Sequence, residues 1–150
     1  MKKIISIILV ISFCTLLFSC GKQPDAYEIL GEFISAYGAD GIIYSPTLSE
    51  GETGYIPEGL VEKIYVFSGR FPDNYAIFLN SHPESGSECG VFVCDDVEML
   101  LMVEEMCIER TLLIGQGSDR SFIKKSGNSV FYSTMQNKER AERLWKEIIR

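Results

Sequence analysis

Histidine and tryptophan are almost absent from this chain, whose 150 residues include one of each, His82 and Trp145. A site with two imidazole ligands is therefore excluded for a single chain, and any serine–histidine or cysteine–histidine nucleophile would have to use His82. A phosphate-binding loop is also absent, because Gly115 and Gly117 lack the Lys and Ser/Thr of a P-loop. The sequence predicts no cofactor and no metal ion.

Basic residues are outnumbered, with 14 Lys and Arg against 21 Asp and Glu and a formal net charge of −7. Without Lys2 and Lys3, which lie in the N-terminal segment, the charge is −7 − 2 = −9. An acidic chain does not suit nucleic acid, and an anionic membrane surface repels it.

No apolar run reaches the length of a membrane span. The N-terminal run, Ile4 to Phe18, has 15 residues and follows the basic pair Lys2 and Lys3. A spanning helix needs about 20 predominantly apolar residues, whereas this run has the length of a signal-peptide hydrophobic region. We expect a signal peptide, with an uncleaved N-terminal anchor helix as the alternative.

The sequence Leu17-Phe18-Ser19-Cys20 ends this segment and resembles the lipobox read by the bacterial prolipoprotein enzymes. The resemblance implies a diacylglyceryl thioether on Cys20 and cleavage between Ser19 and Cys20. Cys14 is a poorer match because bulky Phe13 precedes it. The expected parts are a lipoprotein signal peptide (1–19), a lipidated tether (20–24) and a single domain (25–150).

A lipid on Cys20 would be the membrane attachment. Each buried methylene contributes about 0.8 kcal/mol, and two acyl chains of the palmitate type anchor a protein stably where one does not. We therefore expect a lipid-anchored protein at the extracytoplasmic face of the cell membrane. Residues 21–24 span at most about 3.5 Å each, so the domain would stay close to the bilayer.

The 131 residues from Cys20 onward suffice for one domain, and their pattern predicts an α+β fold. After an N-terminal helix capped by Asp25, with Glu28 completing a capping box, the order strand–turn–strand–helix occurs twice. We expect an antiparallel sheet of about four strands backed by helices. The expected elements are strands at Asn74–Asn80 and Cys89–Cys94, a helix to about Ile114, strands flanking Gly127-Asn128, a helix from about Asn137, and possible short elements at Gly41–Tyr44 and Leu60–Tyr65.

Three passages resemble a family of short Gram-positive lipoproteins that contain a domain of unknown function. They are "NYAIFLNS", "CGVFVCDDVEMLLMVEEMCIER" and "GNSVFYSTMQNKERAERLW", and the lipobox accompanies them. Glu109-Arg110 match the end of the family's helix, whereas Cys89 and Cys94 depart from its pattern. The resemblance implies an envelope lipoprotein and carries over no catalytic residue.

Acidic residues permit two interpretations. Asp95, Asp96 and Glu98 could bind a hard cation such as calcium, but they lack EF-hand spacing, and acids at a helix start are explained by capping and by the helix dipole. A convergent pair of catalytic carboxylates elsewhere stays open. A solvated helix face is expected for Glu104, Glu105 and Glu109.

Most aromatic residues are expected in the core, including Trp145 in the apolar stripe of the last helix with Ala141, Leu144 and Ile148. Tyr44, Tyr55 and Phe71 flank the loop-rich segment 45–55 and could form an exposed cluster, which would mark a ligand or partner site.

Three cysteines remain in the domain. Cys89 and Cys94 lie on one strand and point to opposite faces, so they cannot bond to each other. If Cys89 faces the following helix, a Cys89–Cys107 disulfide is the pairing that the geometry permits. The alternative is buried thiols that act as small apolar groups.

Two functional hypotheses follow. The first is a non-catalytic binding module of the cell envelope, whose partner is an envelope protein or a wall component. The second is a small envelope hydrolase or ligand-processing enzyme, which would use His82 or paired carboxylates in a concave site.

Overall fold

A five-stranded antiparallel sheet forms the middle layer of the computed structural model, which describes residues 25–57, 59–67, 69–114 and 117–150. The expected sites at Ser19 and Cys20, and segments 1–19 and 20–24, lie outside the described residues. In the described part of the chain, no helix combines the length and apolar character needed to cross a membrane.

The strand order is β1-β2-β3-β5-β4, and all neighbouring strands are antiparallel. The predicted number of about four strands is corrected to five, because the short segment Gly41–Tyr44 pairs with β2 as an edge strand. No tight turn connects this segment to β2, because the loop and α3 (Val61–Tyr65) lie between them in the sequence, so no hairpin signal indicates the pairing. The strands are β1 (Gly41–Tyr44), β2 (Asn74–Asn80), β3 (Glu88–Val93), β4 (Phe122–Ser126) and β5 (Ser129–Ser133).

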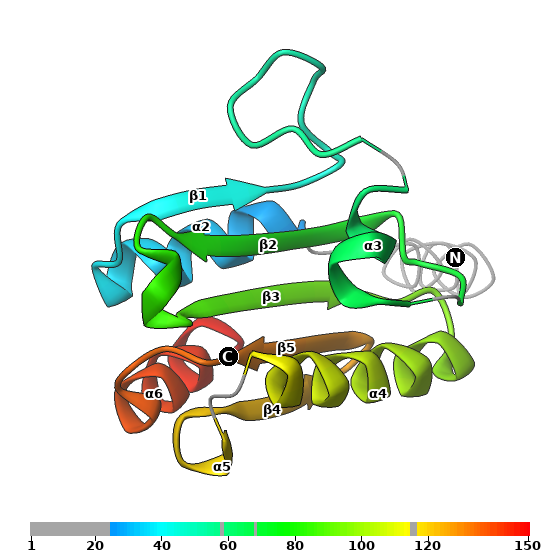
Figure 1. Cartoon of the computed structure of the whole chain (residues 1–150). Coiled ribbons are helices and arrows are strands. Elements are labelled where there is room, and N and C mark those ends of the chain that lie inside the picture. The colour runs from blue at the N-terminus through cyan, green and yellow to red at the C-terminus, as the bar shows by residue number, and fades with distance from the viewer. Residues whose placement is uncertain (1–24, 58, 68, 115–116) are drawn as a thin grey trace, which may run out of the picture.

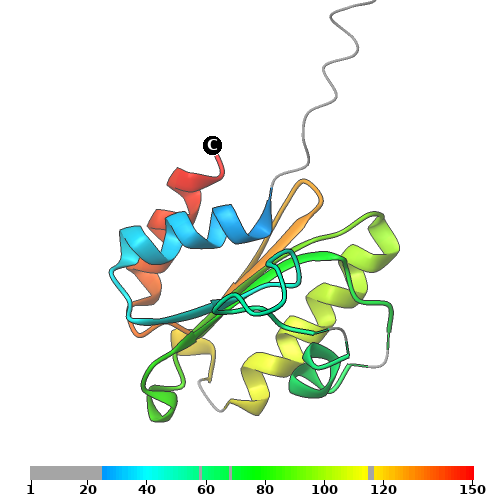
Figure 2. The same ribbon diagram turned by 90° about the horizontal axis from the view of Figure 1, so that it is seen from above.

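Helices cover both faces of the sheet: α2 and α6 pack on one face, and α3 and α4 pack on the other (Figure 2). Side chains cap the longer helices, with Asp25 accepting from the N–H of Tyr27 and Asn137 from that of Arg140. The helices are α2 (Ala26–Tyr37), α3 (Val61–Tyr65), α4 (Val97–Leu113), α5 (Gly117–Arg120) and α6 (Lys138–Ile148), with a 3₁₀ turn η1 at Pro83–Ser85.

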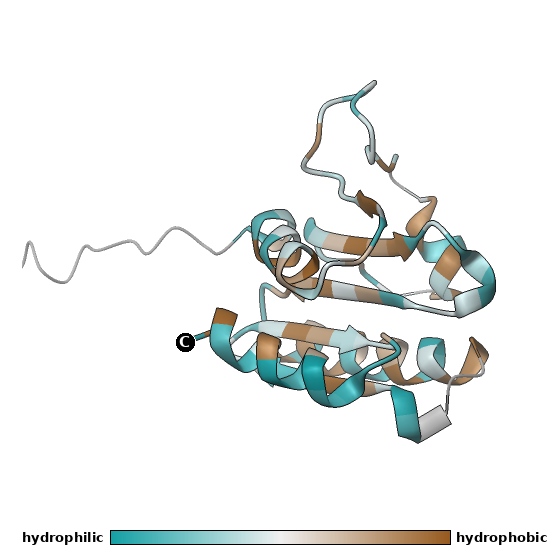
Figure 3. Ribbon diagram, turned by 90° about the vertical axis from the view of Figure 1, so that its left-hand side faces the viewer, coloured by the Kyte–Doolittle hydropathy of each residue, from teal (hydrophilic) through white to brown (hydrophobic). Residues whose placement is uncertain are grey.

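Aromatic stacking dominates the core beneath α2 and α6. Trp145 is buried as predicted, and its ring stacks on that of Phe131 with centroids 4.0 Å apart and planes 7° apart. Phe33 of α2 meets Phe131 edge-on at 5.0 Å. Figure 3 shows the hydrophobic strands between the helix layers and the hydrophilic outer side of α6.

The cysteines correct the predicted orientation of β3. Cys89 is buried toward α2 and α6, whereas Cys107 is buried toward α3 and α4, on the other side of the sheet. Cys89, Cys94 and Cys107 are all free, so the Cys89–Cys107 disulfide is wrong and the buried-thiol alternative is confirmed. Burial raises the pKa of the Cys89 and Cys107 thiols, and it raises that of Cys94 to about 11.

Candidate functional site

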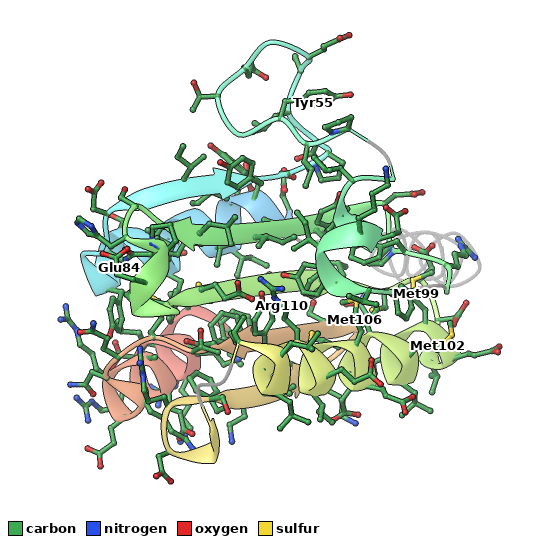
Figure 4. All side chains as sticks on the ribbon, viewed as in Figure 1. Tyr55, Glu84, Met99, Met102, Met106 and Arg110 are labelled. Atoms are coloured by element: carbon green, nitrogen blue, oxygen red, sulfur yellow. The ribbon has the colours of Figure 1, made fainter. Side chains whose placement is uncertain are left out.

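Helix α4 is positioned by a cap at its start and by apolar contacts on its inner side. Asp96 accepts from the N–H of Met99 at 2.8 Å, as the cap interpretation of the acids predicted. Met99, Val103 and Met106 are buried against the sheet, and Figure 4 labels the two methionines. These contacts determine which side of α4 is turned outward.

A buried ion pair fixes the C-terminal half of α4. Arg110 donates from Nε and Nη2 to the two carboxylate oxygens of Glu88, both at 2.7 Å, and from Nη1 to the carbonyl of Ile64 at 3.0 Å. The Glu88 side chain is 7% exposed and that of Arg110 is 17% exposed. The pair therefore joins α4 to β3 and to α3, and Arg110 lies between α4 and the sheet in Figure 4.

Two tyrosines complete this network. Tyr132 donates its hydroxyl to Glu88 at 2.7 Å, and its oxygen lies 2.5 Å from the hydroxyl of Tyr65. Burial raises the pKa of both tyrosines, so both hydroxyls stay protonated and can donate in sequence toward Glu88. Tyr132 can cross β3 closely because residue 90 is glycine, where a Cβ would lie 2.7 Å from the ring.

The same ion pair keeps the arginine charged. Hydrogen bonding to Glu88 raises the pKa of Arg110 above its already high ordinary value, so the guanidinium stays charged beside the Glu88 side chain. The network is thus a structural support for α4.

The outer side of α4 carries an apolar stripe. Val97, Leu101, Ile108 and Leu112 are between 46% and 72% exposed. At about 100° per residue these four side chains fall within about 60° around the helix axis. The stripe is about 22 Å long at 1.5 Å per residue. Single exposed apolar residues are common on protein surfaces, but four that are aligned along one helix form a patch. We call these four residues the α4 stripe.

An acidic row runs beside the α4 stripe. Glu98, Glu105 and Glu109 are exposed, and none forms an ion pair with another described residue. They lie on one side of the stripe, at about 80–120° from Val97 around the helix. On the other side, Glu104 is half-buried and pairs with Lys125 at 2.6 Å, so the predicted solvated face holds for Glu105 and Glu109 but not fully for Glu104.

Val66, at the end of α3, extends the apolar surface. It is 74% exposed and has a left-handed backbone, with φ of 54°, where a β-branched residue is rare. This conformation costs about 1–2 kcal/mol, and the exposed side chain offers no burial in return. Val66, Glu109, Leu112 and Leu113 line an open hollow of about 430 Å³. Strain of this kind concentrates at functional sites.

The predicted aromatic cluster at Tyr44, Tyr55 and Phe71 is divided in two. Tyr44 and Tyr55 are half-buried and line an apolar pocket of about 230 Å³ between the loop, α3 and the β1–β2 edge of the sheet. Phe71 instead packs with Tyr65, and its ring lies 4.9 Å from that of Tyr75. The pocket offers only tyrosine hydroxyls as polar side-chain groups.

The predicted catalytic candidate His82 lies in a separate concave region of about 580 Å³ that Asp40 and Glu84 also line. Its Nδ1 is 3.5 Å from Glu84 Oε1, and both side chains are exposed. Two serine hydroxyls nearby are engaged elsewhere: Ser85 Oγ accepts from a backbone N–H, and Ser87 Oγ accepts from Arg120. No hydrogen bond joins His82 to a nucleophile among the described residues. In Figure 4, Glu84 and Tyr55 lie on distant parts of the surface.

The acids proposed as a cation site are not arranged as one. Asp96 caps α4, Asp95 pairs with Arg70 at 2.9 Å, and Glu98 is exposed. No group of three or more potential metal ligands occurs within the part of the chain that the structure describes.

Our sequence interpretation missed the α4 stripe. The signal was present, because Val97, Leu101, Ile108 and Leu112 follow helical spacing as regularly as the buried residues of the same helix. Apolar residues lie on two sides of α4, and only the position of the helix in the outer layer shows which of these sides is buried and which is free.

Comparison with known proteins gives no assignment: no protein-family model matches the chain, and no curated protein or solved structure does so either. The similarity to short Gram-positive lipoproteins stays a prediction.

Proposed function

We propose that this chain is a non-catalytic binding module of the cell envelope, held at the extracytoplasmic face of the membrane by a lipid on Cys20. The observation that carries the binding role is the α4 stripe with its neighbour Val66, an exposed apolar surface without convergent polar groups. Such surfaces mark sites of protein or membrane interaction. The partner would be an envelope protein or a wall component.

Photo-crosslinking in intact cells tests the binding role. A benzophenone amino acid at Leu101 is expected to give a discrete crosslinked product, because the partner covers the α4 stripe. The matched control places the same residue at Glu32, which is exposed on α2 at the opposite face of the sheet. The same products at both positions, or none at Leu101, would contradict the proposed surface.

The anchoring role rests on the lipobox. We expect Cys20→Ala to abolish incorporation of labelled fatty acid and to release or mislocalise the protein. Cys14→Ala is the matched control and should leave both labelling and location unchanged. Persistent labelling of the Cys20→Ala variant would show that the lipid is attached elsewhere.

A second candidate is a small envelope hydrolase that acts at the concave region of His82. Its support is that Asp40, Glu84 and His82 line one hollow of suitable size. Hydrolytic activity that is lost in His82→Ala and retained in Leu101→Asp would favour this enzyme over the binding module.

A further inference from the structure

We infer that the α4 stripe binds an amphipathic helix of a partner protein, and that this helix carries Lys or Arg along one flank. The inference rests on the proposed binding function and specifies the chemistry of the partner. It follows from the shape of the stripe, from the charges beside it and from the position of Val66.

The spacing of the stripe fits a helix. Val97, Leu101, Ile108 and Leu112 are separated by four, seven and four residues, so they form an apolar ridge of two pairs along about four turns. Glu104 and Glu105 flank the gap between the pairs. An amphipathic helix packs against such a ridge through its own residues at i, i+3, i+4 and i+7. Because the ion pair of Arg110 with Glu88 holds α4 against the sheet, the ridge is presented by a rigid element.

The charges beside the ridge define the partner's flank. Glu98, Glu105 and Glu109 follow one side without a basic partner among the described residues, whereas Glu104 on the other side is neutralised by Lys125. Complementarity therefore calls for basic residues on one flank of the bound helix, spaced to meet three acids along α4.

The same charges disfavour the other occupants of an apolar surface. In an antiparallel pair of α4 helices related by a twofold axis near Glu105, the two Glu105 carboxylates would approach each other, and like charges placed together at an interface are unfavourable. A bilayer with anionic lipids would repel the acidic row.

Val66 lies at the C-terminal end of the ridge, beside Leu112. The hollow that Val66, Leu112 and Leu113 line with Glu109 can accept one apolar side chain near the end of the bound helix, with Glu109 at its edge. Glycine would adopt the left-handed backbone at residue 66 without strain, so the valine side chain needs a reason other than stability. Contact with the partner is such a reason.

Peptide binding to the full-length protein in detergent tests the inference. The probes are three labelled peptides: an idealised amphipathic helix with a Lys flank, the same helix with a Glu flank, and a scrambled peptide with the Lys composition. Fluorescence anisotropy should show the Lys-flank helix binding at least tenfold more tightly than either of the others, and more weakly as salt is added. Equal binding of the Lys-flank and scrambled peptides would overturn the inference.

Substitutions identify the surface. Leu101→Asp should weaken binding of the Lys-flank helix at least tenfold, and Glu105→Lys combined with Glu109→Lys should reverse the preference toward the Glu-flank helix. The control is Glu32→Lys, which reverses an exposed charge on the opposite face of the sheet. It should change neither the affinity for the Lys-flank helix nor the preference for that helix over the Glu-flank helix. An unchanged preference in the Glu105→Lys, Glu109→Lys variant would overturn the charge assignment.

Val66→Gly separates a binding role from a structural one. We expect an unfolding midpoint that is equal or higher and a several-fold weaker affinity for the Lys-flank helix. Unchanged affinity would remove Val66 from the site.

The other occupants have distinct outcomes. If the protein self-associates and Leu101→Asp abolishes this association, the ridge binds a second copy of the chain. If the Cys20→Ala variant adsorbs to phosphatidylcholine–phosphatidylglycerol vesicles and adding Leu101→Asp abolishes the adsorption, the ridge binds the bilayer. Either result overturns the inference. A crosslinked partner at Leu101 in cells, together with failure of the Lys-flank helix, would leave the proposed function intact and overturn this inference alone.

Discussion

Glu88→Ala should lower the free energy of unfolding by about 3–5 kcal/mol, because it leaves the guanidinium of Arg110 buried without its carboxylate. The hydroxyl of Tyr132 also loses its acceptor. This is a large share of the roughly 5–15 kcal/mol that stabilises a typical domain. Urea unfolding followed by far-UV circular dichroism measures the loss.

Two control variants identify the buried charge as the cause. Arg70→Ala removes an exposed ion pair with Asp95 and should change the stability by at most about 1 kcal/mol. Replacing both Glu88 and Arg110 with Met removes both charges, and it should recover much of the stability that Glu88→Ala loses. A Glu88→Ala variant as stable as Arg70→Ala would show that the pair does not hold α4.

Trp145→Ala should lower the free energy of unfolding by about 3–5 kcal/mol, since it empties the largest buried site in the core beneath α2 and α6. The substitution removes the stack on Phe131 as well as the apolar contacts of the indole. Thermal unfolding followed by circular dichroism tests this, and an unchanged midpoint would contradict the burial of the ring.

Trp145→Phe provides the matched control. The indole Nε1 is buried and has no hydrogen-bond partner among the described residues, so phenylalanine loses no hydrogen bond and keeps an aromatic ring against Phe131. Its destabilisation should be clearly smaller than that of Trp145→Ala.

The helices were the more predictable part of the fold. The caps at Asp25, Asp96 and Asn137 are local signals, because each side chain bonds to a backbone group two or three residues away. The apolar spacing of the last helix likewise places Trp145 in the core without any knowledge of its neighbours.

The orientation of β3 was not predictable in the same way. Every residue of this strand is buried, so no alternation of polar and apolar side chains shows which face meets α4. The disulfide prediction failed for this reason, since Cys89 lies on the face opposite to Cys107.

The candidate site depends on tertiary placement. The sequence contains the α4 stripe and the acidic row. It does not show that α3 and α4 cover one face of the sheet and that the outer side of α4 is left free (Figure 2). The contact between Glu88 and Arg110 joins residues 22 positions apart, which no local pattern indicates.

Cysteine protection at the α4 stripe tests the central claim most directly. Cys89, Cys94 and Cys107 are buried, so a maleimide should not reach them in the folded domain. A cysteine introduced at exposed Leu112 should react with the maleimide. We expect Leu112→Cys to react readily in purified protein and at least fivefold more slowly in intact cells, where the partner covers it, whereas Glu32→Cys reacts equally in both. Equal reactivity of Leu112→Cys in cells and in purified protein, with the Glu32→Cys control accessible, would contradict a bound partner at this surface.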